Sequence, residues 1–292
     1  MKRTSDIAII GPGRVGTALG VLAVRAGRSV GGVAGGGPGR AAVAAETIGA
    51  TEPTPPPEAA ASARLVLLTV PDEEIRGVCE ELSAAGAFDE DTVVAHCSGA
   101  LGSGELASAR GCGASVGSTH PLQTFPTAAA AVEKIPGTFF FIEGDEAAIT
   151  TLESLAVAIG GRPVRIDSQA KPLYHAAAVL ACNYLTALFD AALSTGERAG
   201  IERTQVAEAM EPLMLATLEN AREMGTEQAL TGPIVRGDVE TVRLHLERLE
   251  GSEQRRVYRV MGQYTVGLAE RSGRLSGSRA EQMRRLLRRE KE

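Results

Sequence analysis

Tryptophan is absent from this chain of 292 residues, and aromatic residues make up only 3% of it. Basic residues are fewer than acidic ones, 30 against 36, so the formal net charge is −6 at pH 7. Proteins that bind nucleic acid need clustered Lys and Arg and aromatic rings on which bases can stack. The one basic cluster lies among glutamates near the C-terminus, where we expect a solvated helix end: Arg284, Arg285, Arg288 and Arg289. We therefore expect no nucleic-acid partner.

Cysteine is scarce, and its spacing fits no metal site. The four cysteines are scattered without a CxxC pair: Cys79, Cys97, Cys112 and Cys182. The apolar run before Gly11 has only four residues, which is too short for the core of a signal peptide. We also expect no stretch long enough to span a membrane. These absences predict a cytoplasmic protein with no metal site and no membrane partner.

The first 167 residues alternate short apolar runs with helix-like segments, a pattern typical of βαβ units and a parallel sheet. Seven strands are expected, at Asp6–Ile10, Ser29–Ala34, Arg64–Val70, Thr92–Cys97, Ala114–Thr119, Thr138–Ile142 and Pro163–Ile166. Helices are expected between them, at Arg14–Gly27, Arg40–Ile48, Asp72–Ala85 and Asp145–Ile159. The proline-rich stretch Pro53–Pro57 is interpreted as a stiff loop inside this domain.

After Asp167 the β-branched runs disappear and long helical patterns follow. The expected helices are Lys171–Ala199, Arg203–Met224, with a kink at Pro212, Val239–Leu249 and Glu253–Arg271. The last fourteen residues are charged and are interpreted as frayed helix. The fold class is therefore α/β, with a doubly wound parallel sheet in residues 1–167 and an all-helical domain in residues 168–292.

The segment Gly11-Pro-Gly-Arg-Val-Gly16 fits the pattern G-x-G-x-x-G. It follows a predicted strand directly and opens a predicted helix, which is the context that a dinucleotide site requires. Gly11 permits the tight turn, Gly13 lets the backbone approach a pyrophosphate, and Gly16 lets the helix pack on the strand. With Arg14 and Val15, these glycines are the expected cofactor-binding turn; a plain glycine-rich turn is the structural alternative.

The second strand predicts which dinucleotide binds. An NAD site places Asp or Glu at the end of this strand to bind the ribose 2′-hydroxyl. Here the chain reads Val33-Ala-Gly-Gly-Gly-Pro-Gly-Arg40, without an acid. Arg40 could neutralise a 2′-phosphate, so NADP (NADPH) is favoured and NAD is less favoured; an ordinary surface arginine is the alternative reading.

Further polar residues follow the ends of the next strands, where parallel sheets bind ligands. Val70 and Pro71 are expected against the cofactor, and Ser98 and Gly99 against nicotinamide or substrate. Cys97 could be a nucleophile, but a cysteine at a strand end is more often buried and inert. His120 and Gln123 are candidate substrate contacts, with a loop histidine as the alternative for His120.

The helical domain opens on Lys171-Pro-Leu-Tyr-His175, which puts two polar side chains four residues apart on an otherwise apolar helix. Lys171 and His175 are the candidate catalytic pair, although a solvated Lys and a structural His remain the alternatives. Asn183 is a further candidate substrate contact. Arg236 could clamp a substrate carboxylate, or it could be exposed beside a helix that Asp238 caps.

In order, these segments resemble Rossmann-like proteins with a C-terminal helical domain of the DUF2520 type. That group is related to ketopantoate reductases, β-hydroxyacid dehydrogenases and pyrroline-5-carboxylate reductases. The matching pieces span residues 6 to about 245: Gly11–Gly16, Val70–Asp72, His96–Gly99, His120–Phe125, Lys171, Tyr174–Ala177, Asn183 and Thr231–Asp238. The resemblance implies an NAD(P)-dependent reductase that acts on a small 2-oxo acid, with ketopantoate as a candidate.

In the better-known relatives, the helix that opens the second domain carries a catalytic Lys and, four residues later, an Asn. Lys171 matches this Lys, whereas position 175 is His. The resemblance thus implies that Lys171 stabilises or protonates the alkoxide, with His175 beside it. The apolar helical domain predicts a homodimer. Two rival functions stay open: a non-catalytic NADP-binding sensor and a reductase that uses deazaflavin.

Overall fold

The computed structural model describes residues 3–50 and 53–288, and the chain divides into two compact units between Val179 and Leu180. Unit 1 comprises residues 1–179 and unit 2 residues 180–292. The division falls inside the helix α8 (Lys171–Ala181), so that the polar residues at the start of this helix belong to unit 1. The predicted domain boundary at residues 167/168 stays a prediction.

Unit 1 is built on a seven-stranded sheet with the order β2-β1-β3-β4-β5-β6-β7. Its strands match the seven expected segments to within two residues at nearly every end: β1 (Ser5–Ile10), β2 (Val30–Ala34), β3 (Ala63–Leu68), β4 (Val93–His96), β5 (Ser115–Pro121), β6 (Phe139–Gly144) and β7 (Arg162–Arg165). The first five strands run parallel to one another. Their carboxyl ends therefore meet at one edge of the sheet, as the polar strand-end residues require.

The last two strands depart from the expected parallel sheet, since β7 runs parallel to the reversed β6. β6 pairs antiparallel with β5, and Phe140 lies opposite Pro121, the last residue of β5. The helix between these strands, α6 (Ala128–Lys134), spans only about 10 Å and packs against α1 (Arg14–Arg25). It does not return the chain to the opposite edge of the sheet, so β6 starts where β5 ends and runs back along it.

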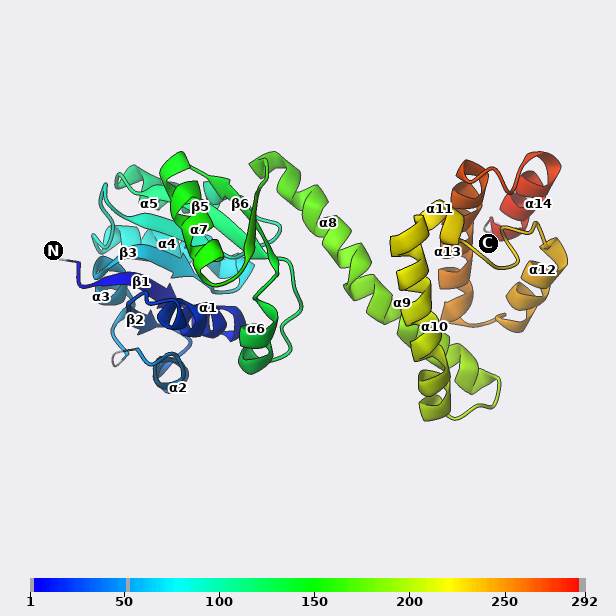
Figure 1. Cartoon of the computed structure of the whole chain (residues 1–292), viewed down its shortest axis with the longest axis horizontal. Helices are drawn as coiled ribbons and strands as arrows, with labels where there is room; N and C mark the ends of the chain where they lie inside the picture. Colours follow the sequence, from blue (N-terminus) through cyan, green and yellow to red (C-terminus); the bar gives the residue numbers. More distant parts are fainter. Residues whose placement is uncertain (1–2, 51–52, 289–292) are drawn as a thin grey trace. The chain divides into compact units, whose positions relative to one another are not determined.

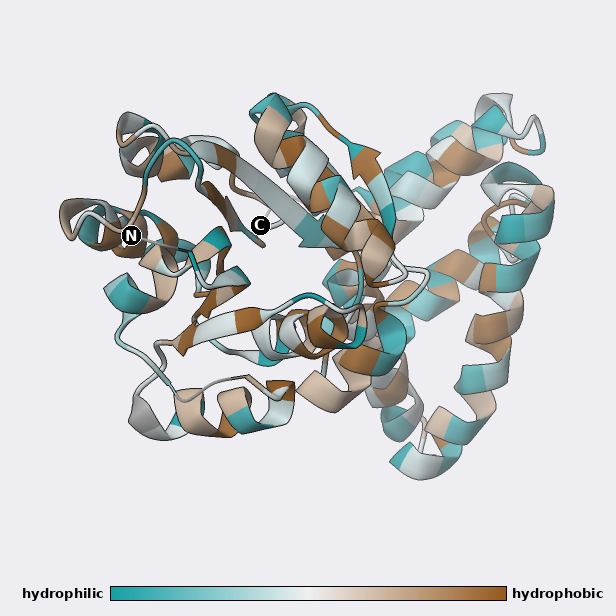
Figure 2. Ribbon diagram, turned by 60° about the vertical axis from the view of Figure 1, so that its left-hand side comes forward, coloured by the Kyte–Doolittle hydropathy of each residue, from teal (hydrophilic) through white to brown (hydrophobic). Residues whose placement is uncertain are grey.

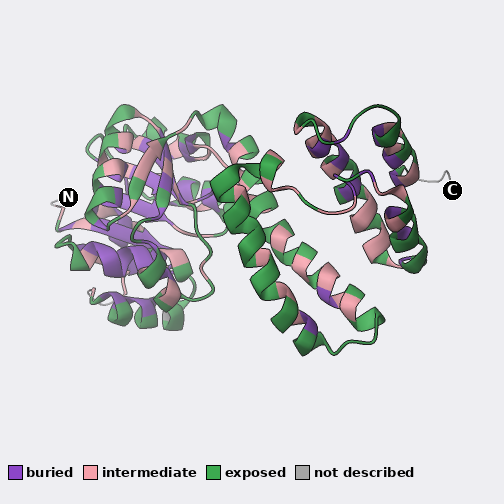
Figure 3. Ribbon diagram, turned by 45° about the vertical axis from the view of Figure 1, so that its right-hand side comes forward, coloured by how far each residue is buried: buried purple, intermediate pink, exposed green. Residues whose placement is uncertain are grey.

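Alternate residues of the strands face two apolar layers, because side chains of a strand point alternately to opposite faces. Ile7 and Ile9 face a core formed with α1, α2, α6 and α7, whereas Ala8 and Ile10 face a core formed with α3, α4 and α5. Figure 1 shows helices on both faces of the sheet, and Figure 3 shows the strands buried between them.

The remaining bounds are α2 (Pro38–Ile48), α3 (Pro56–Ala61), α4 (Ile75–Ala84), α5 (Ala107–Gly111), α7 (Glu146–Ala158) and the short 3-10 turns Asp72–Glu74, Ser103–Leu106 and Ser168–Ala170. The doubly wound fold class is confirmed.

Unit 2 is helical, as predicted. Its helices are α9 (Asn183–Arg198), α10 (Arg203–Met224), α11 (Thr226–Ala229), α12 (Val239–Arg248), α13 (Glu253–Arg271) and α14 (Gly277–Leu287). Its core gathers residues from α12, α13 and α14 and from the segment before them, including Val242, Val266 and Met283. Pro212 lies inside α10, which continues through it.

Three local expectations were wrong. Pro56 starts helix α3 rather than ending a loop, because proline tolerates the first helical turn, where its missing N–H has no partner in any case. The expected helix Lys171–Ala199 is interrupted at Cys182. The described part of the C-terminal segment is helical and packed: in α14 Ala280, Met283 and Leu287 are buried, and Arg284 pairs with Glu270. Arg289 lies outside the described residues.

The sequence was also expected to contain no membrane-length apolar stretch, and one is present. The helical stretch Ser168–Arg198 has a mean hydropathy of 1.6 over its best window, and only 6% of that window is buried. Figure 2 shows apolar residues recurring along the long helices. Length and composition alone would allow this stretch to cross a membrane, but an exposed apolar face also suits a partner protein.

Candidate active site

The glycine turn between β1 and α1 shows what each glycine is needed for. Gly11 has a φ of +84°, and a Cβ there would collide with the Val70 side chain. A Cβ on Gly16 would collide with the Thr69 hydroxyl and come within 3.0 Å of Ile9. These two glycines are therefore required for the turn and for packing of the helix on the strand.

Gly13 is different, because the fold does not need it. Its φ is −82°, and a Cβ there would approach only the carbonyl oxygen of Gly11, at 4.0 Å. The space over Gly13 is thus open at the start of α1, a helix that begins without a side-chain cap. Backbone N–H groups and the positive end of a helix dipole form a site for a phosphate group. The turn fits a pyrophosphate at this position.

The second glycine turn carries Arg40. Gly35, Gly36 and Gly37 all have positive φ, which explains the run of glycines after β2. A Cβ on Gly36 would come within 2.8 Å of Cδ of Arg40, so the arginine stem lies across this turn. A Cβ on Gly35 would lie 3.2 Å from the Gly11 nitrogen, so the two glycine turns are adjacent. The exposed Arg40 guanidinium is therefore held beside the cofactor turn, where an adenosine 2′-phosphate would need a cation.

Ser98 follows β4, and its hydroxyl and N–H groups make hydrogen bonds within the protein. Its hydroxyl donates to Oδ2 of Asp72 at 2.7 Å and accepts from the N–H groups of Ala100 and Leu101. Its N–H donates to Nδ1 of His96, whose Nε2 donates to the Gly102 carbonyl oxygen at 3.0 Å. Burial lowers the pKa of His96, which keeps this ring neutral. Ser98 thus shapes the segment that carries Gly99.

Lys171 is completely buried, with 0% of its surface exposed. Its Nζ donates to the Ser98 carbonyl oxygen at 2.9 Å and to the Ser118 hydroxyl, and it lies 3.9 Å from Oε1 of Glu143. Burial lowers the pKa of Lys171 to about 8, although the charge of Glu143 opposes this shift. In this arrangement the ammonium group joins the start of α8 to the ends of β4 and β5.

Glu143 was missed by the sequence analysis. It is buried in β6, where Oε1 accepts from the Ser103 N–H at 2.7 Å and Oε2 accepts from the Ser103 hydroxyl at 2.8 Å. The available signal was a single acid that ends the apolar run Phe139-Phe-Phe-Ile. Buried carboxylates are almost always paired, but only the structure shows that this acid is buried.

Two histidines and a tyrosine form the polar cluster that faces Gly99. The Tyr174 hydroxyl lies 2.8 Å from Nδ1 of His120, and the His175 ring contacts the His120 ring edge to face, with centroids 5.7 Å apart. A Cβ on Gly99 would collide with Nδ1 of His175 and come within 2.9 Å of Nε2 of His120. Both rings therefore turn a nitrogen toward the same space above Gly99.

The other predicted substrate contacts lie outside this cluster in unit 1 or belong to unit 2. Gln123 is exposed and bonds to the N–H of Thr124. Asn183 starts α9, and Arg236 is exposed; both residues belong to unit 2. Asp238 caps α12, which agrees with the alternative of an exposed Arg236 beside a capped helix. Burial raises the pKa of Cys97 to about 12, so this thiol stays protonated and is a poor nucleophile.

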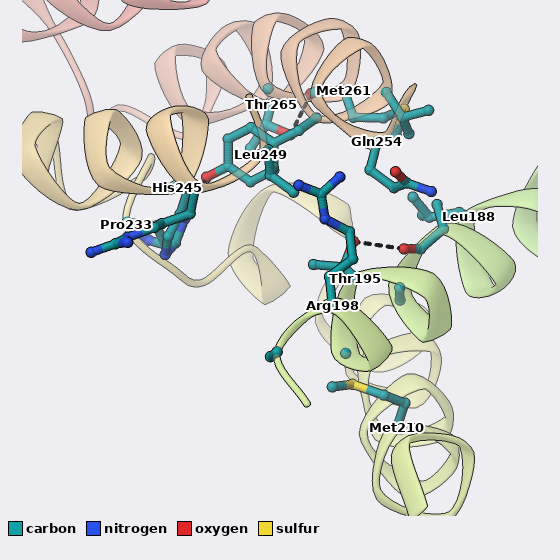
Figure 4. A pocket seen from close by; sticks show the side chains of 18 of the residues that line it. Leu188, Thr195, Arg198, Met210, Pro233, His245, Leu249, Gln254, Met261 and Thr265 are labelled. Carbon is teal, nitrogen blue, oxygen red and sulfur yellow. Dashed lines mark hydrogen bonds between the residues drawn. The ribbon is translucent and has the colours of Figure 1, made fainter. Parts of the chain in front are cut away.

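Unit 2 contains a separate cavity of about 850 Å³ (Figure 4). Apolar side chains such as Leu188, Met210 and Met261 line it, and the Tyr258 hydroxyl lies 2.8 Å from Nδ1 of His245 at its wall. None of the site residues predicted from the sequence lines this cavity. The candidate active site is therefore the strand-end cluster of unit 1.

A parallel sheet covered by helices on both faces, with an open glycine turn at the first helix, defines a dinucleotide-binding type of domain. The Rossmann-like domain family matches residues 2–121, and the domain of unknown function DUF2520 matches residues 138–265. The chain therefore carries a Rossmann-like domain followed by a DUF2520 domain, which confirms the resemblance read from the sequence.

Solved structures share this fold over most of the chain. A candidate NADP oxidoreductase of Bacteroides fragilis (BF3122) has a TM-score of 0.71 and 22% identity, and the match covers 91% of this chain and 98% of that one. Protein TM1727 of Thermotoga maritima has a TM-score of 0.69 and 26% identity, covering 91% and 99%. A reductive aminase of Aspergillus terreus, in complex with NADPH and ethyl levulinate, has a TM-score of 0.67 and 18% identity, covering 96% and 98%.

The relation to pyrroline-5-carboxylate reductases is found as well. The enzyme of Coxiella burnetii has a TM-score of 0.58 and 18% identity, and the match covers 94% of this chain and 100% of that one. No curated protein matches the sequence. At these identities the likeness establishes the fold, and the activity has to be argued from the site.

Proposed function

We propose that the protein is an NADP-dependent reductase of small carbonyl or imine compounds. The observation that carries this proposal is the open space over Gly13, which the fold leaves without any packing need for glycine. Open space at this place, in the turn between the first strand and the start of α1, is where a dinucleotide's pyrophosphate approaches the backbone. The neighbours named as NADP oxidoreductase, reductive aminase and pyrroline-5-carboxylate reductase support the same function.

The residues present divide the tasks of such a reaction. NADPH, when bound, supplies the hydride. The Gly13 turn and the start of α1 would hold its pyrophosphate, and Arg40 would hold its 2′-phosphate. Val70 and Pro71 follow β3 and would limit the cofactor on one side, since Val70 lies against the Gly11 turn. Lys171 acts through Ser98, because its ammonium group fixes the carbonyl that precedes Gly99.

The substrate would bind over Gly99, against His120 and His175. Both rings face this space, and a 2-oxo acid such as ketopantoate is the substrate that the family resemblance favours. Gln123, Asn183 and Arg236 remain candidate contacts for the remainder of the substrate. The neighbours broaden the substrate class to imines, because a reductive aminase shares the fold.

The test is a panel of 2-oxo acids, including ketopantoate, and of cyclic imines, each mixed with NADPH or NADH and followed by the loss of nicotinamide absorbance. We expect oxidation of NADPH with at least one compound and slower oxidation of NADH. Tight NADPH binding without turnover of any compound would favour the NADP-binding sensor. If neither NADPH nor NADH binds and a reduced deazaflavin does, the result would favour a deazaflavin-dependent reductase.

We also propose that the chain works as a homodimer in the cytoplasm, with the helical domain as the interface. Leu173, Leu180 and Leu188 recur along the exposed stretch Ser168–Arg198, and Leu213 and Leu218 are exposed on α10. Leu173 is 78% and Leu180 63% exposed, which is costly for side chains of this size in water. A second copy of the chain would cover these apolar residues.

The dimer is tested by analytical ultracentrifugation of Leu180→Glu combined with Leu218→Glu. We expect the wild type to sediment as a dimer and the variant as a monomer. Val157→Glu is the matched control, because Val157 is 61% exposed on α7 and should change nothing. A wild-type monomer that partitions into lipid vesicles would instead assign the apolar stretch to a membrane.

A further inference from the structure

The contact between Tyr174 and His120 orients a proton. Tyr174 lies on α8, where its ring packs against Phe141 with centroids 4.2 Å apart, and its hydroxyl lies 2.8 Å from Nδ1 of His120. Among residues 3–50 and 53–288, this is the one hydrogen bond that the Tyr174 hydroxyl makes. The hydroxyl donates to Nδ1 when the His120 proton is on Nε2, and it accepts when that proton is on Nδ1.

The protonation state of the pair follows from burial. Burial raises the pKa of Tyr174 to about 12, so the hydroxyl keeps its proton at neutral pH. Burial, assisted by His175 and Lys171, lowers the pKa of His120 to about 4, so its ring is neutral. A neutral imidazole carries one proton. When Nδ1 accepts from the Tyr174 hydroxyl, that proton is on Nε2, the nitrogen that lies toward Gly99.

His175 indicates that a ligand occupies this space. Its Nδ1 is buried and has no hydrogen-bond partner within the described part of the chain. A buried polar atom without a partner destabilises the folded protein. Of the atoms that a Cβ on Gly99 would meet, this nitrogen is the nearest and Nε2 of His120 the next, so a polar ligand atom between them would contact both rings.

We propose, building on the reductase function above, that His120 is the catalytic proton donor and that Tyr174 is the positioning residue that fixes its tautomer and resupplies its proton. The substrate's reacting oxygen binds over Gly99, between Nε2 of His120 and Nδ1 of His175. This assigns the proton to a residue whose Nε2 lies toward Gly99, whereas the ammonium group of Lys171 is buried among protein partners.

The step balances as follows. The carbonyl carbon receives a hydride, with its two electrons, from the reduced nicotinamide, and the π bond breaks to leave the electron pair on oxygen. The Nε2–H bond of His120 breaks and its proton goes to that oxygen. Nδ1 takes the proton of the Tyr174 hydroxyl, and the tyrosinate is then protonated by water. The relay runs in this direction because an alkoxide is a stronger base than a tyrosinate.

The tautomer can be measured without turnover. The chain has only four histidines, so ¹⁵N-histidine labelling gives a simple NMR spectrum, in which His120→Gln identifies the His120 signals. At pH 7 we expect a protonated Nε2 and an unprotonated Nδ1 for His120. In Tyr174→Phe, Nδ1 loses its donor, and we expect its signal to shift. A ring protonated on Nδ1 in the wild type would overturn the proposal.

The kinetic test uses the first substrate found by the panel. Tyr174→Phe should lower kcat and kcat/KM together by about 10²-fold, the lower end for loss of a positioned proton donor, and should leave NADPH affinity unchanged. The solvent deuterium isotope effect of the wild type should change in this variant, because proton transfer becomes slower than hydride transfer. Loss of packing alone would not alter that effect.

The chain provides a matched control. Tyr258 and His245 form a second pair with the same 2.8 Å separation and the same edge-to-face rings, and they line the cavity of unit 2. Tyr258→Phe should keep wild-type turnover and isotope effect. An active enzyme in which both tyrosine variants behave alike would overturn the relay and leave the reductase function intact. Absence of turnover with every compound would refute the reductase function, and the NMR result would still decide the tautomer.

Discussion

Nζ of Lys171 lies 2.9 Å from the carbonyl oxygen of Ser98, a residue 73 positions earlier in the chain. This bond joins the first residue of α8 to the segment that follows β4, and it does so without any exposed surface on the lysine. The turn of α8 that follows carries Tyr174 and His175, so the position of both depends on this buried ammonium group. A charge in the interior also makes the stability of the protein depend on pH.

The first prediction concerns that dependence. The pKa of Lys171 is about 8 in the folded protein, below the ordinary value of 10.5. Between these pH values the unfolded chain binds more protons than the folded one, so the free energy of unfolding should rise with pH. The full contribution is about 3 kcal/mol, at 1.36 kcal/mol for each pH unit of the shift. Urea denaturation at pH 8 and pH 10.5 measures it.

The control removes both charges. Lys171→Met alone would leave Glu143 buried without a cation, which costs about 3–5 kcal/mol. The double variant Lys171→Met with Glu143→Gln avoids this and should lack the extra rise between pH 8 and 10.5. Parallel pH profiles for the wild type and the double variant would show that Lys171 is not the group that titrates.

The second prediction tests the cofactor turn. Gly13→Val should fold with normal stability, because φ at this position is negative and the added side chain meets no protein atom closer than 4.0 Å for its Cβ. It should lose the thermal stabilisation that NADPH gives the wild type, since binding to the folded state raises Tm. Gly77→Val on α4 is the control, because that position is equally open and lies outside the turn. If NADPH stabilises Gly13→Val as much as the wild type, the cofactor does not bind at this turn.

The third prediction concerns the choice between NADPH and NADH. With no acid after β2 and with Arg40 lying across Gly36, NADPH should stabilise the wild type more than NADH at equal concentration. Arg40→Ala should narrow this difference by weakening NADPH binding about 10-fold, the loss of one charge-assisted contact worth roughly 1.5 kcal/mol. Arg25→Ala, an exposed arginine at the end of α1, should leave the difference unchanged. If the difference between NADPH and NADH stabilisation is unchanged in Arg40→Ala, Arg40 does not select the cofactor.

The fourth prediction places the substrate. Gly99→Ala would put a methyl group against Nδ1 of His175 and Nε2 of His120, in the space proposed for the reacting oxygen. We expect turnover to fall at least about 10²-fold while NADPH stabilisation persists, because a misplaced donor loses its stabilisation of the transition state. Gly104→Ala, where a Cβ meets nothing within 4 Å, should keep full activity. Full activity of Gly99→Ala would exclude this space as the substrate site.

The local sequence determined much of this protein. Alternation of apolar runs predicted all seven strands, since each strand of a covered parallel sheet must be apolar on both faces. The glycine spacing of Gly11, Gly13 and Gly16 predicted the turn before α1, because the backbone conformation and close packing there exclude a side chain at two of the three positions. The helical character of unit 2 followed from the same kind of periodicity.

What only the tertiary structure decided was which residues meet. Lys171 and His175 are four residues apart in the sequence, yet the lysine is enclosed by β4, β5 and β6 while the histidine faces Gly99. Glu143, Ser118 and Tyr174 entered the site through contacts that join distant segments, and no local pattern specifies such contacts. The reversal of β6 was equally hidden, because strand direction depends on where the intervening chain packs. Helix and strand periodicity arises within a few residues, whereas burial and hydrogen-bond partners arise only when the whole chain has folded.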